Sequence, residues 1–352
     1  MAGEANLPMS LLYLLGGRQR KLLFKNEEEQ RLYEAALILL LDTSAGTARV
    51  ELEYKTPPEA RASDESSHSF KSATLVGNKF YTCTSTEVLI FEVPGFKRIH
   101  YISLPCFNDL HHVTPTPEGN LLVANTGLDM VVMFTPEGRV LAEWNVLGED
   151  PWSRFSRDVD YRKVESTKPH PSHPNSVFQL GQDVWVTRLS QKDAVCLTTP
   201  GKRINIDVQR PHDGLVRGGR IYFTTVDGRI VIANRHSLAI DQIIDLHEIH
   251  RIQNQEDALL GWCRGVLPLD ERRLWVGFTR VRKTKFTENV MWIKHAFKEK
   301  ERPTHIALYD IEEKTCMQEI DLEGYGMNVI FGIYPAVLQK EPESGQGATK
   351  SR

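Results

Sequence analysis

The sequence has few of the features that mark several protein classes. It holds only five cysteines in 352 residues, widely spaced and without a CxxC pair. An odd count with that spacing argues against a disulfide framework and a thiolate zinc site. No apolar run is long enough to span a bilayer, so we expect no membrane partner. The opening MAGEANLPMSLLYLLGG has no basic segment before its short apolar run, so we expect no signal peptide. These absences predict a cytoplasmic location.

A strong charge of either sign is also missing. The net charge is −3, and the basic residues are mostly dispersed, so we do not expect a nucleic-acid partner. The chain has no GxSxG elbow, no P-loop and no dinucleotide fingerprint between a strand and a helix. Composition leaves the oligomeric state open.

The most informative stretch is residues 109–144, which predicts four short strands. The two turns PEGN (117–120) and PEGR (136–139) lie between apolar, β-branched runs. Proline presets the entry to such a turn, and glycine supplies the positive φ. Four antiparallel strands of this length form one blade of a propeller.

The second-strand pattern of this blade recurs along the chain, at residues 79–83, 183–187, 220–224 and 273–277, with residues 36–41 as a sixth copy. The first strands are expected to begin near Lys71, His111, Asn175, Gly214, Arg264 and Asn328. One blade cannot bury its own faces, so repeats at this spacing predict a closed ring. We therefore predict an all-β, six-bladed propeller over residues 36–336, closed by pairing residues 326–336 with strands from residues 36–54. Residues 1–35 are expected to be an N-terminal extension and residues 337–352 a disordered tail.

The segments LHHVTPTPEGNLLVANTG (110–127) and RPHDGLVRGGRIYFTTVDG (210–228) resemble the six-bladed propellers of the NHL-repeat and SMP-30/gluconolactonase superfamily. The resemblance is at the level of fold and covers residues 36–335. It implies a propeller whose members include hydrolases, lyases and binding modules. Gluconolactonase-type members hold a divalent metal on the axis with acidic and asparagine ligands, whereas this chain has histidines at several comparable points.

Two insertions interrupt the repeat, at residues 148–172 and 280–304. The first connects two blades, and the second joins the second and third strands of the fifth blade. In a propeller both kinds of connection emerge on one face, so both should overhang the same mouth of the channel. Between Arg280 and Arg302 the second insertion has eight Lys/Arg and three Glu. It is either a solvated face or a basic lid that favours an anionic ligand.

The same mouth receives the starts of the inner strands, where three successive blades place a histidine. Three imidazole ligands that leave coordination positions of the metal open are typical of a catalytic metal site. His112, His173 and His212 are therefore predicted to bind a divalent Zn, Fe, Mn or Cu ion. His111 and His112 are consecutive in a strand and point to opposite sides. We favour His112 as the one facing the channel. The alternative is that these histidines bond loop carbonyls and hold no metal.

Other residues are expected around this mouth. Arg264 is the predicted anion anchor, and Asp213, Asn175 and Asn328 are predicted catalytic groups, with turn and pairing roles as the alternatives. His111, Tyr161, Arg162, His170 and Cys263 are the further candidates for substrate contact. We predict a metal-dependent hydrolase or lyase acting on a small, anionic molecule. The alternative is a non-catalytic propeller that binds a ligand or protein through the same face.

Overall fold

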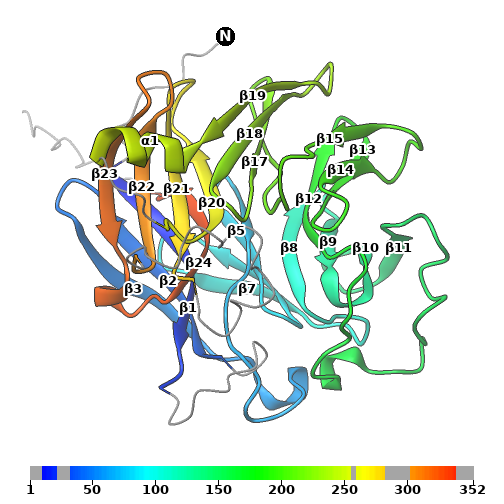
Figure 1. The fold of residues 1–352 in the computed structure, drawn as a ribbon. Helices are drawn as coiled ribbons and strands as arrows, with labels where there is room; N and C mark the ends of the chain where they lie inside the picture. The colour runs from blue at the N-terminus through cyan, green and yellow to red at the C-terminus, as the bar shows by residue number, and fades with distance from the viewer. Residues whose placement is uncertain (1–9, 22–31, 255–258, 282–301, 338–352) are drawn as a thin grey trace, which may run out of the picture.

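The computed structural model describes residues 10–21, 32–254, 259–281 and 302–337, which form a six-bladed β-propeller (Figure 1). Each blade is a four-stranded antiparallel sheet. Five blades follow the chain from their first to their fourth strand, and the closing blade combines both ends of the chain. The predicted all-β, six-bladed fold is confirmed. Within the described residues no helix is both long enough and apolar enough to cross a membrane.

The blades are numbered here in chain order. Their strands are β4 Ala73–Val76, β5 Lys79–Cys83, β6 Val88–Glu92 and β7 Lys97–Ile102 in blade 1; β8 Leu110–Pro115, β9 Leu121–Asn125, β10 Met130–Phe134 and β11 Val140–Asn145 in blade 2; β12 Pro174–Leu180, β13 Asp183–Arg188, β14 Asp193–Cys196 and β15 Arg203–Asn205 in blade 3; β16 Leu215–Arg217, β17 Arg220–Thr224, β18 Arg229–Asn234 and β19 Ile240–Asp245 in blade 4; and β20 Trp262–Pro268, β21 Arg273–Thr279, β22 His305–Asp310 and β23 Thr315–Asp321 in blade 5. The closing blade has the order β24 Val329–Pro335, β1 Leu11–Gln19, β2 Tyr33–Asp42 and β3 Thr47–Tyr54. One α-helix, α1 Leu246–Asn254, follows blade 4.

The core lies between blades rather than inside one of them. Each pair of neighbouring blades encloses its own apolar cluster. A strand in the middle of a blade is therefore covered on both faces, which is why all five residues of β9, LLVAN, are buried. The outer strand β7, KRIHYI, is exposed except for its last residue. First strands of neighbouring blades pack on one another, as β4 does on β8 and β8 on β12, so they form the inner ring.

The turn chemistry matches the expectation from sequence. Gly119 has φ of 86° and Gly138 has φ of 87°, the left-handed region that glycine enters without steric cost. Across the first turn Val113 of β8 pairs with Val123 of β9, and across the second Val132 of β10 pairs with Glu143 of β11. The repeated PEG turns thus set the spacing of blade 2.

The closing blade differs in one respect from the prediction. Residues 36–41 belong to β2, the third strand of this blade, and β1 is its second strand. The strand β24 pairs directly with β1, so part of the expected N-terminal extension lies inside the propeller. The strand β1, LLYLLGGRQ, was not predicted from the sequence because its two glycines lower its strand propensity. They are needed there: a Cβ on Gly16 would lie 1.8 Å from the carbonyl oxygen of Val329.

The two insertions are described to different extents. Most of the expected basic lid, residues 282–301, and the expected disordered tail from residue 338 onwards lie outside the described residues. The inter-blade insertion is described throughout. It packs Tyr161 into the cluster between blades 1 and 2, with Tyr161 donating its backbone N–H to the carbonyl of Pro105.

Candidate functional site at the channel mouth

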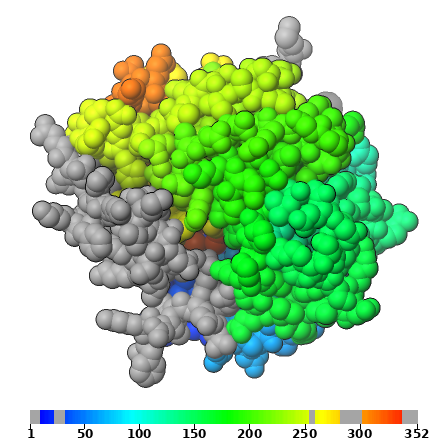
Figure 2. All heavy atoms as spheres, turned by 45° about the vertical axis from the view of Figure 1, so that its right-hand side comes forward, coloured from blue at the N-terminus to red at the C-terminus, as the bar shows by residue number. Residues whose placement is uncertain are grey.

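A hollow and a smaller chamber meet at one end of the inner ring. The hollow, about 830 Å³ with its opening to solvent included, is lined by Lys71, Asp109, Arg162, Lys168, His170 and Phe331 among others. The chamber, about 290 Å³ by the same measure, is lined by Ser72, His111, Asn175, Ser176, His212, Asp213, Arg264 and Phe331. Phe331 of β24 borders both spaces. In Figure 2 dark red atoms of the C-terminal strand are visible at the bottom of a central opening, beside the green atoms of blade 3 and the preceding insertion.

Two cations lie against the ring of Phe331. Nζ of Lys71 and Cζ of Arg264 are each 5.0 Å from the ring centroid, within the range of a cation–π contact. Nζ of Lys71 is also 3.6 Å from Oδ1 of Asp109. Burial alone would raise the pKa of Asp109, but His111 and Lys71 outweigh it and hold that pKa well below its usual range. Asp109 is therefore a carboxylate at neutral pH.

His111 faces the chamber, and its hydrogen bonds fix its tautomer. The side-chain amide of Asn175 donates through Nδ2 to the carbonyl of Pro211, at 2.9 Å, so its Oδ1 is the atom that faces His111. Nδ1 of His111 lies 2.8 Å from that oxygen and must be the donor. Burial lowers the pKa of His111, against the opposing effect of Asp109. In the neutral ring the lone pair is then on Nε2, which lies 3.4 Å from Oδ1 of Asp109, and a proton taken up by Nε2 would be shared with this carboxylate.

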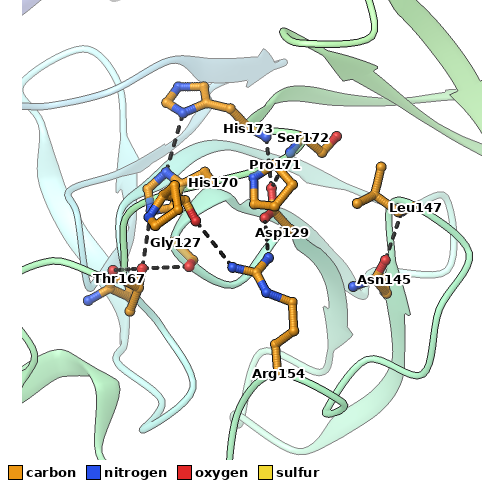
Figure 3. Close-up of polar contacts among 12 residues, drawn as sticks. Gly127, Asp129, Asn145, Leu147, Arg154, Thr167, His170, Pro171, Ser172 and His173 are labelled. Carbon is orange, nitrogen blue, oxygen red and sulfur yellow. Dashed lines mark hydrogen bonds and ion pairs between the residues drawn. The ribbon is translucent and has the colours of Figure 1, made fainter.

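His173 is held in the same way through a chain of three side chains (Figure 3). The hydroxyl of Thr167 donates to the carbonyl of Gly127 at 2.5 Å, so it accepts from Nε2 of His170 at 3.1 Å. Nδ1 of His170 then accepts from Nδ1 of His173 at 3.4 Å. Burial lowers the pKa of both rings, that of His173 well below its usual value. The lone pair of His173 is thus also on Nε2.

His212 completes the pattern. Its Nδ1 lies 3.1 Å from the carbonyl oxygen of Cys263, which can only accept, and burial followed by the charge of Arg264 lowers its pKa well below the usual value. His111, His173 and His212 therefore all hold Nδ1–H in a hydrogen bond and keep Nε2 as an acceptor. The rings of His111 and His173 are in edge contact, with centroids 4.8 Å apart.

The backbone at this mouth is strained at two of these positions. Asp109 has φ of 46° and His173 has φ of 58°, each just before the first strand of its blade. Residues other than glycine rarely enter this region, and such outliers cluster at functional sites. The side chain of Asp109 lines the hollow, and the ring of His173 lies in edge contact with that of His111. The strain could not be read from the sequence.

His112 is placed differently from the expectation, and His111 takes the position facing the chamber. Nε2 of His112 lies 3.2 Å from the carbonyl oxygen of Ala73. Its Nδ1 lies 3.2 Å from the backbone N–H of Val177. Both ring nitrogens are thus used between blades 1 and 3, and burial lowers the pKa of His112 to about 4. The weak preference for His112 was wrong because Leu110 and His112 flank an irregularity in the pairing of β8 with β9, which breaks simple alternation.

The other candidates divide into two groups. Asn175, Asp213, Arg264, Arg162 and His170 line the chamber or the hollow. Asp213 is buried, which raises its pKa, and accepts from the N–H of Gly265 at 3.0 Å and from the hydroxyl of Thr224.

Three candidates have their side chains elsewhere. Tyr161 packs between blades, and its hydroxyl accepts from the N–H of Ser156. Cys263 is fully buried in the apolar cluster between blades 4 and 5, and burial raises its pKa well above the usual value. Asn328 accepts through Oδ1 from the N–H of Gln19 at 2.9 Å, which joins β24 to the end of β1. Sequence reasoning missed Lys71, Asp109 and Phe331 as site residues, although Lys71 and Asp109 stand where first strands were expected to begin.

The predicted metal ligands are not gathered as one set. Among the described residues, the ligand atoms of His112, His173 and His212 do not all lie within 4.8 Å of one another, and neither do those of a set with His111 instead. The pinned Nδ1–H groups of His111, His173 and His212 do suit metal ligation, because ligating histidines usually donate their other ring N–H to a carbonyl or carboxylate. Metal binding at this mouth stays a prediction, and it would require these rings to move closer together.

Comparisons with known proteins bear on the fold. No protein-family model and no curated protein matches the chain. Among solved structures, a protein of unknown function from Bacteroides caccae matches with a TM-score of 0.56 and 13% identity, over 92% of this chain and 98% of that one. Virginiamycin B lyase from Staphylococcus aureus matches with TM-scores of 0.41 and 0.42 and 14% identity, over 69% and 68% of this chain and 74% and 73% of that enzyme. The first of these two structures is a catalytically inactive variant with quinupristin. This chain is a six-bladed β-propeller, similar in fold to the Bacteroides caccae protein of unknown function.

Proposed function

We propose that this propeller is an enzyme that binds a small anionic molecule at the channel mouth and removes a proton from it with Nε2 of His111. The observation that carries the proposal is the pair of contacts on His111: Nδ1 donates to Oδ1 of Asn175, and Nε2, the acceptor of the neutral ring, lies 3.4 Å from the Asp109 carboxylate, which would share a proton taken up there. Lys71 and Arg264, on the ring of Phe331, supply the positive charge that an anion needs.

The proton chemistry follows from the same contacts. When Nε2 of His111 takes a proton, the ring becomes an imidazolium that donates to Asn175 on one side and faces the Asp109 carboxylate on the other. A carboxylate beside the new cation stabilises it, which is how a positioned histidine acts as a general base. If the proton comes from carbon, the electron pair can expel a leaving group in an elimination. If it comes from water, the hydroxide attacks the substrate in a hydrolysis.

In the second form of this proposal, the channel mouth binds a divalent metal ion. His111, His173 and His212 would hold the ion through Nε2, with Asn175, His170 and Cys263 retaining their bonds to the three Nδ1–H groups. A bound ion would supply Lewis-acid polarisation of the substrate or a water of lowered pKa. In this form Arg264 keeps its role as anion anchor.

Ligand binding and proton removal can be tested separately. Small carboxylates and phosphates would be screened for a rise in Tm, and those that bind would be incubated with the protein in D₂O. We expect deuterium to enter the bound anion or its product. His111→Gln should still bind the anion but lose the exchange, whereas Arg264→Gln should weaken binding. The exposed His236→Gln is the matched control and should behave as the wild type.

Metal content distinguishes the two forms. A stoichiometric metal in the purified protein that is lost in His212→Ala would support the metal form, and exchange by metal-free protein would support His111 acting alone. If wild type and His111→Gln bind the same anion and neither exchanges a proton with it nor converts it to a product, the protein is a binding module and the enzyme proposal is wrong.

A further inference from the structure

A second cluster of metal-ligating side chains lies on the outer part of blade 5, away from the channel mouth. His250 of α1 meets Cys316 and Glu319 of β23, and one ligand atom from each lies within 4.8 Å of the other two. Among the described residues this is the group whose spacing suits a metal ion. Figure 1 shows α1 beside the outer strands β22 and β23.

The strands bring these side chains to one face. In the β22–β23 pair, Ala307 stands opposite Glu319 and Tyr309 opposite Cys316, with a shift in register between them. Residues directly opposite each other point to the same side of the sheet. Helix α1 packs on β23, and Gln253 fixes it by bonding both the N–H and the carbonyl of Cys316, at 2.9 and 3.1 Å. The position of His250 over the strand is therefore set by the fold.

Two buried histidine nitrogens here are left without a partner. His305 donates through Nδ1 to the carbonyl of Pro303 at 2.7 Å, so its lone pair is on Nε2. That Nε2 has no hydrogen-bond partner among the described residues, although the side chain is only 5% exposed. It lies 3.9 Å from Oε1 of Glu319. Nδ1 of His250, in a side chain 2% exposed, is the second such atom. Buried polar atoms are nearly always satisfied, so Nε2 of His305, which faces Glu319, points to a missing ligand, whereas the His250 nitrogen beside Glu319 is Nε2.

Without a metal, the side chains of His250 and Glu319 are held by other contacts. Nε2 of His250 is 2.7 Å from the hydroxyl of Tyr309 and 3.6 Å from Oε1 of Glu319. Arg302 donates to the same oxygen of Glu319, Oε1, which also lies nearest to His250 and His305. Burial, and then Glu319, raises the pKa of Cys316 to about 12, so the thiol is protonated. A cation would reverse that effect and favour the thiolate.

We propose that His250, Cys316 and Glu319 form a structural Zn²⁺ site that joins α1 to the outer edge of blade 5, and that the ring of His305 moves toward them as the fourth ligand. Imidazole, thiolate and carboxylate are all zinc ligands, and four of them complete a tetrahedral structural site. Binding replaces the Cys316 S–H bond by a Zn–S bond and releases one proton to water. The ion would also displace Arg302 from the carboxylate oxygen it needs. The site is independent of the chemistry proposed for the channel mouth.

The test uses the full-length protein freed of metal and titrated with Zn²⁺, and with Co²⁺ as a spectroscopic probe. We expect Zn²⁺ to raise the Tm and Co²⁺ to give a thiolate-to-metal charge-transfer band in the near ultraviolet. Cys316→Ser should remove the band and weaken Zn²⁺ binding at least about tenfold, as loss of a ligand does. Cys106→Ser, which changes a half-buried thiol in the connection between blades 1 and 2, should alter neither measurement.

Arg302→Gln gives a second, opposite readout. Removing a cation that shares the carboxylate of Glu319 should tighten Zn²⁺ binding several-fold while the protein stays folded, because Arg302 lies at the surface edge of the cluster. The proposal is overturned if Co²⁺ gives no thiolate band in the wild type, or if the band persists in Cys316→Ser.

Discussion

Oδ1 of Asn175 accepts a hydrogen bond from Nδ1 of His111 at 2.8 Å, across the junction of blades 2 and 3. The carbonyl of Pro211 in turn fixes the orientation of the Asn175 amide. Three segments of the chain thereby determine which nitrogen of His111 can accept a proton. The same principle governs His173 and His212, whose Nδ1–H groups are also engaged.

The first prediction concerns the pKa of His111. Burial places it below the ordinary value, so the ring is neutral at pH 7 and a reaction that uses it as a base should rise with pH through that pKa and then level off. Asn175→Asp puts a carboxylate at Nδ1 and should raise the pKa of His111. NMR titration of the labelled imidazole measures this directly. Asn234→Asp, in an outer turn of blade 4, should leave it unchanged; an equal pKa in Asn175→Asp would contradict the assigned contact.

The second prediction is a pH dependence of stability due to His112. Its folded pKa of about 4 lies below the unfolded value, so the unfolded chain binds the extra proton as pH falls. The stability from neutral His112 is complete above about pH 6.5 and is lost as pH falls toward 4. Between pH 7 and pH 5 this amounts to about 2 kcal/mol. Urea unfolding at pH 7 and at pH 5 measures this change in the free energy of unfolding. The change should be smaller in His112→Gln than in the wild type by the amount given above. An equal change in the two proteins would exclude this role of His112.

The third prediction tests the closure of the ring. A Cβ on Gly16 would lie 1.8 Å from the carbonyl oxygen of Val329, where β1 pairs with β24. Because the obstacle is backbone, Gly16→Ala must displace one strand, and we expect a loss of at least about 2 kcal/mol in the free energy of unfolding. Gly219→Ala is the control, since a Cβ there meets no atom within 4 Å among the described residues. Equal stability of the two variants would show that β24 does not rest against β1 as described.

The fold was accessible from sequence because its signals are local. Turn glycines such as Gly119 and the apolar strand β9 can each be recognised from a few neighbouring residues, and the repeat presents the same pattern several times. The strand β1 was missed because Gly16 and Gly17 serve a contact with the other end of the chain, and this long-range requirement weakens the local strand pattern. Local patterns predict blades well and closure less well.

The site was only partly accessible. The sequence predicted that His173, His212 and Arg264 share one end of the inner ring because strand starts share one face, and the structure places His212 and Arg264 in the chamber and His173 against His111. It could not choose between His111 and His112, since that depends on an irregularity in β8. Nor could it show the pairing of Lys71 with Asp109 or the hydrogen-bond chain that ends at His173, because both depend on distances between blades.

The fourth prediction concerns Asp129, the residue that fastens the inter-blade insertion beneath the mouth. Its side chain is 1% exposed and accepts through Oδ1 from the N–H groups of Ser172 and His173, at 3.1 and 2.7 Å, while Oδ2 binds Arg154 at 3.0 Å. Asp129→Ala leaves two buried N–H groups unsatisfied and should cost about 2–3 kcal/mol. Its backbone φ of 51° is also unfavourable for alanine.

Asp129→Asn separates the hydrogen bonds from the charge. Asparagine tolerates the left-handed backbone and keeps one acceptor for the two N–H groups, so it should lose mainly the contact with the partly exposed Arg154 and cost less than the alanine variant. Hydrogen exchange at residues 163–173 should be faster in Asp129→Ala than in Asp129→Asn, and unchanged in Asp158→Ala, which alters an exposed residue of the same insertion. The His173 ring should then lose its fixed position beside His111, seen as a change in its NMR signals. Wild-type exchange rates in Asp129→Ala would mean that the insertion is held by its other contacts and that Asp129 does not position His173.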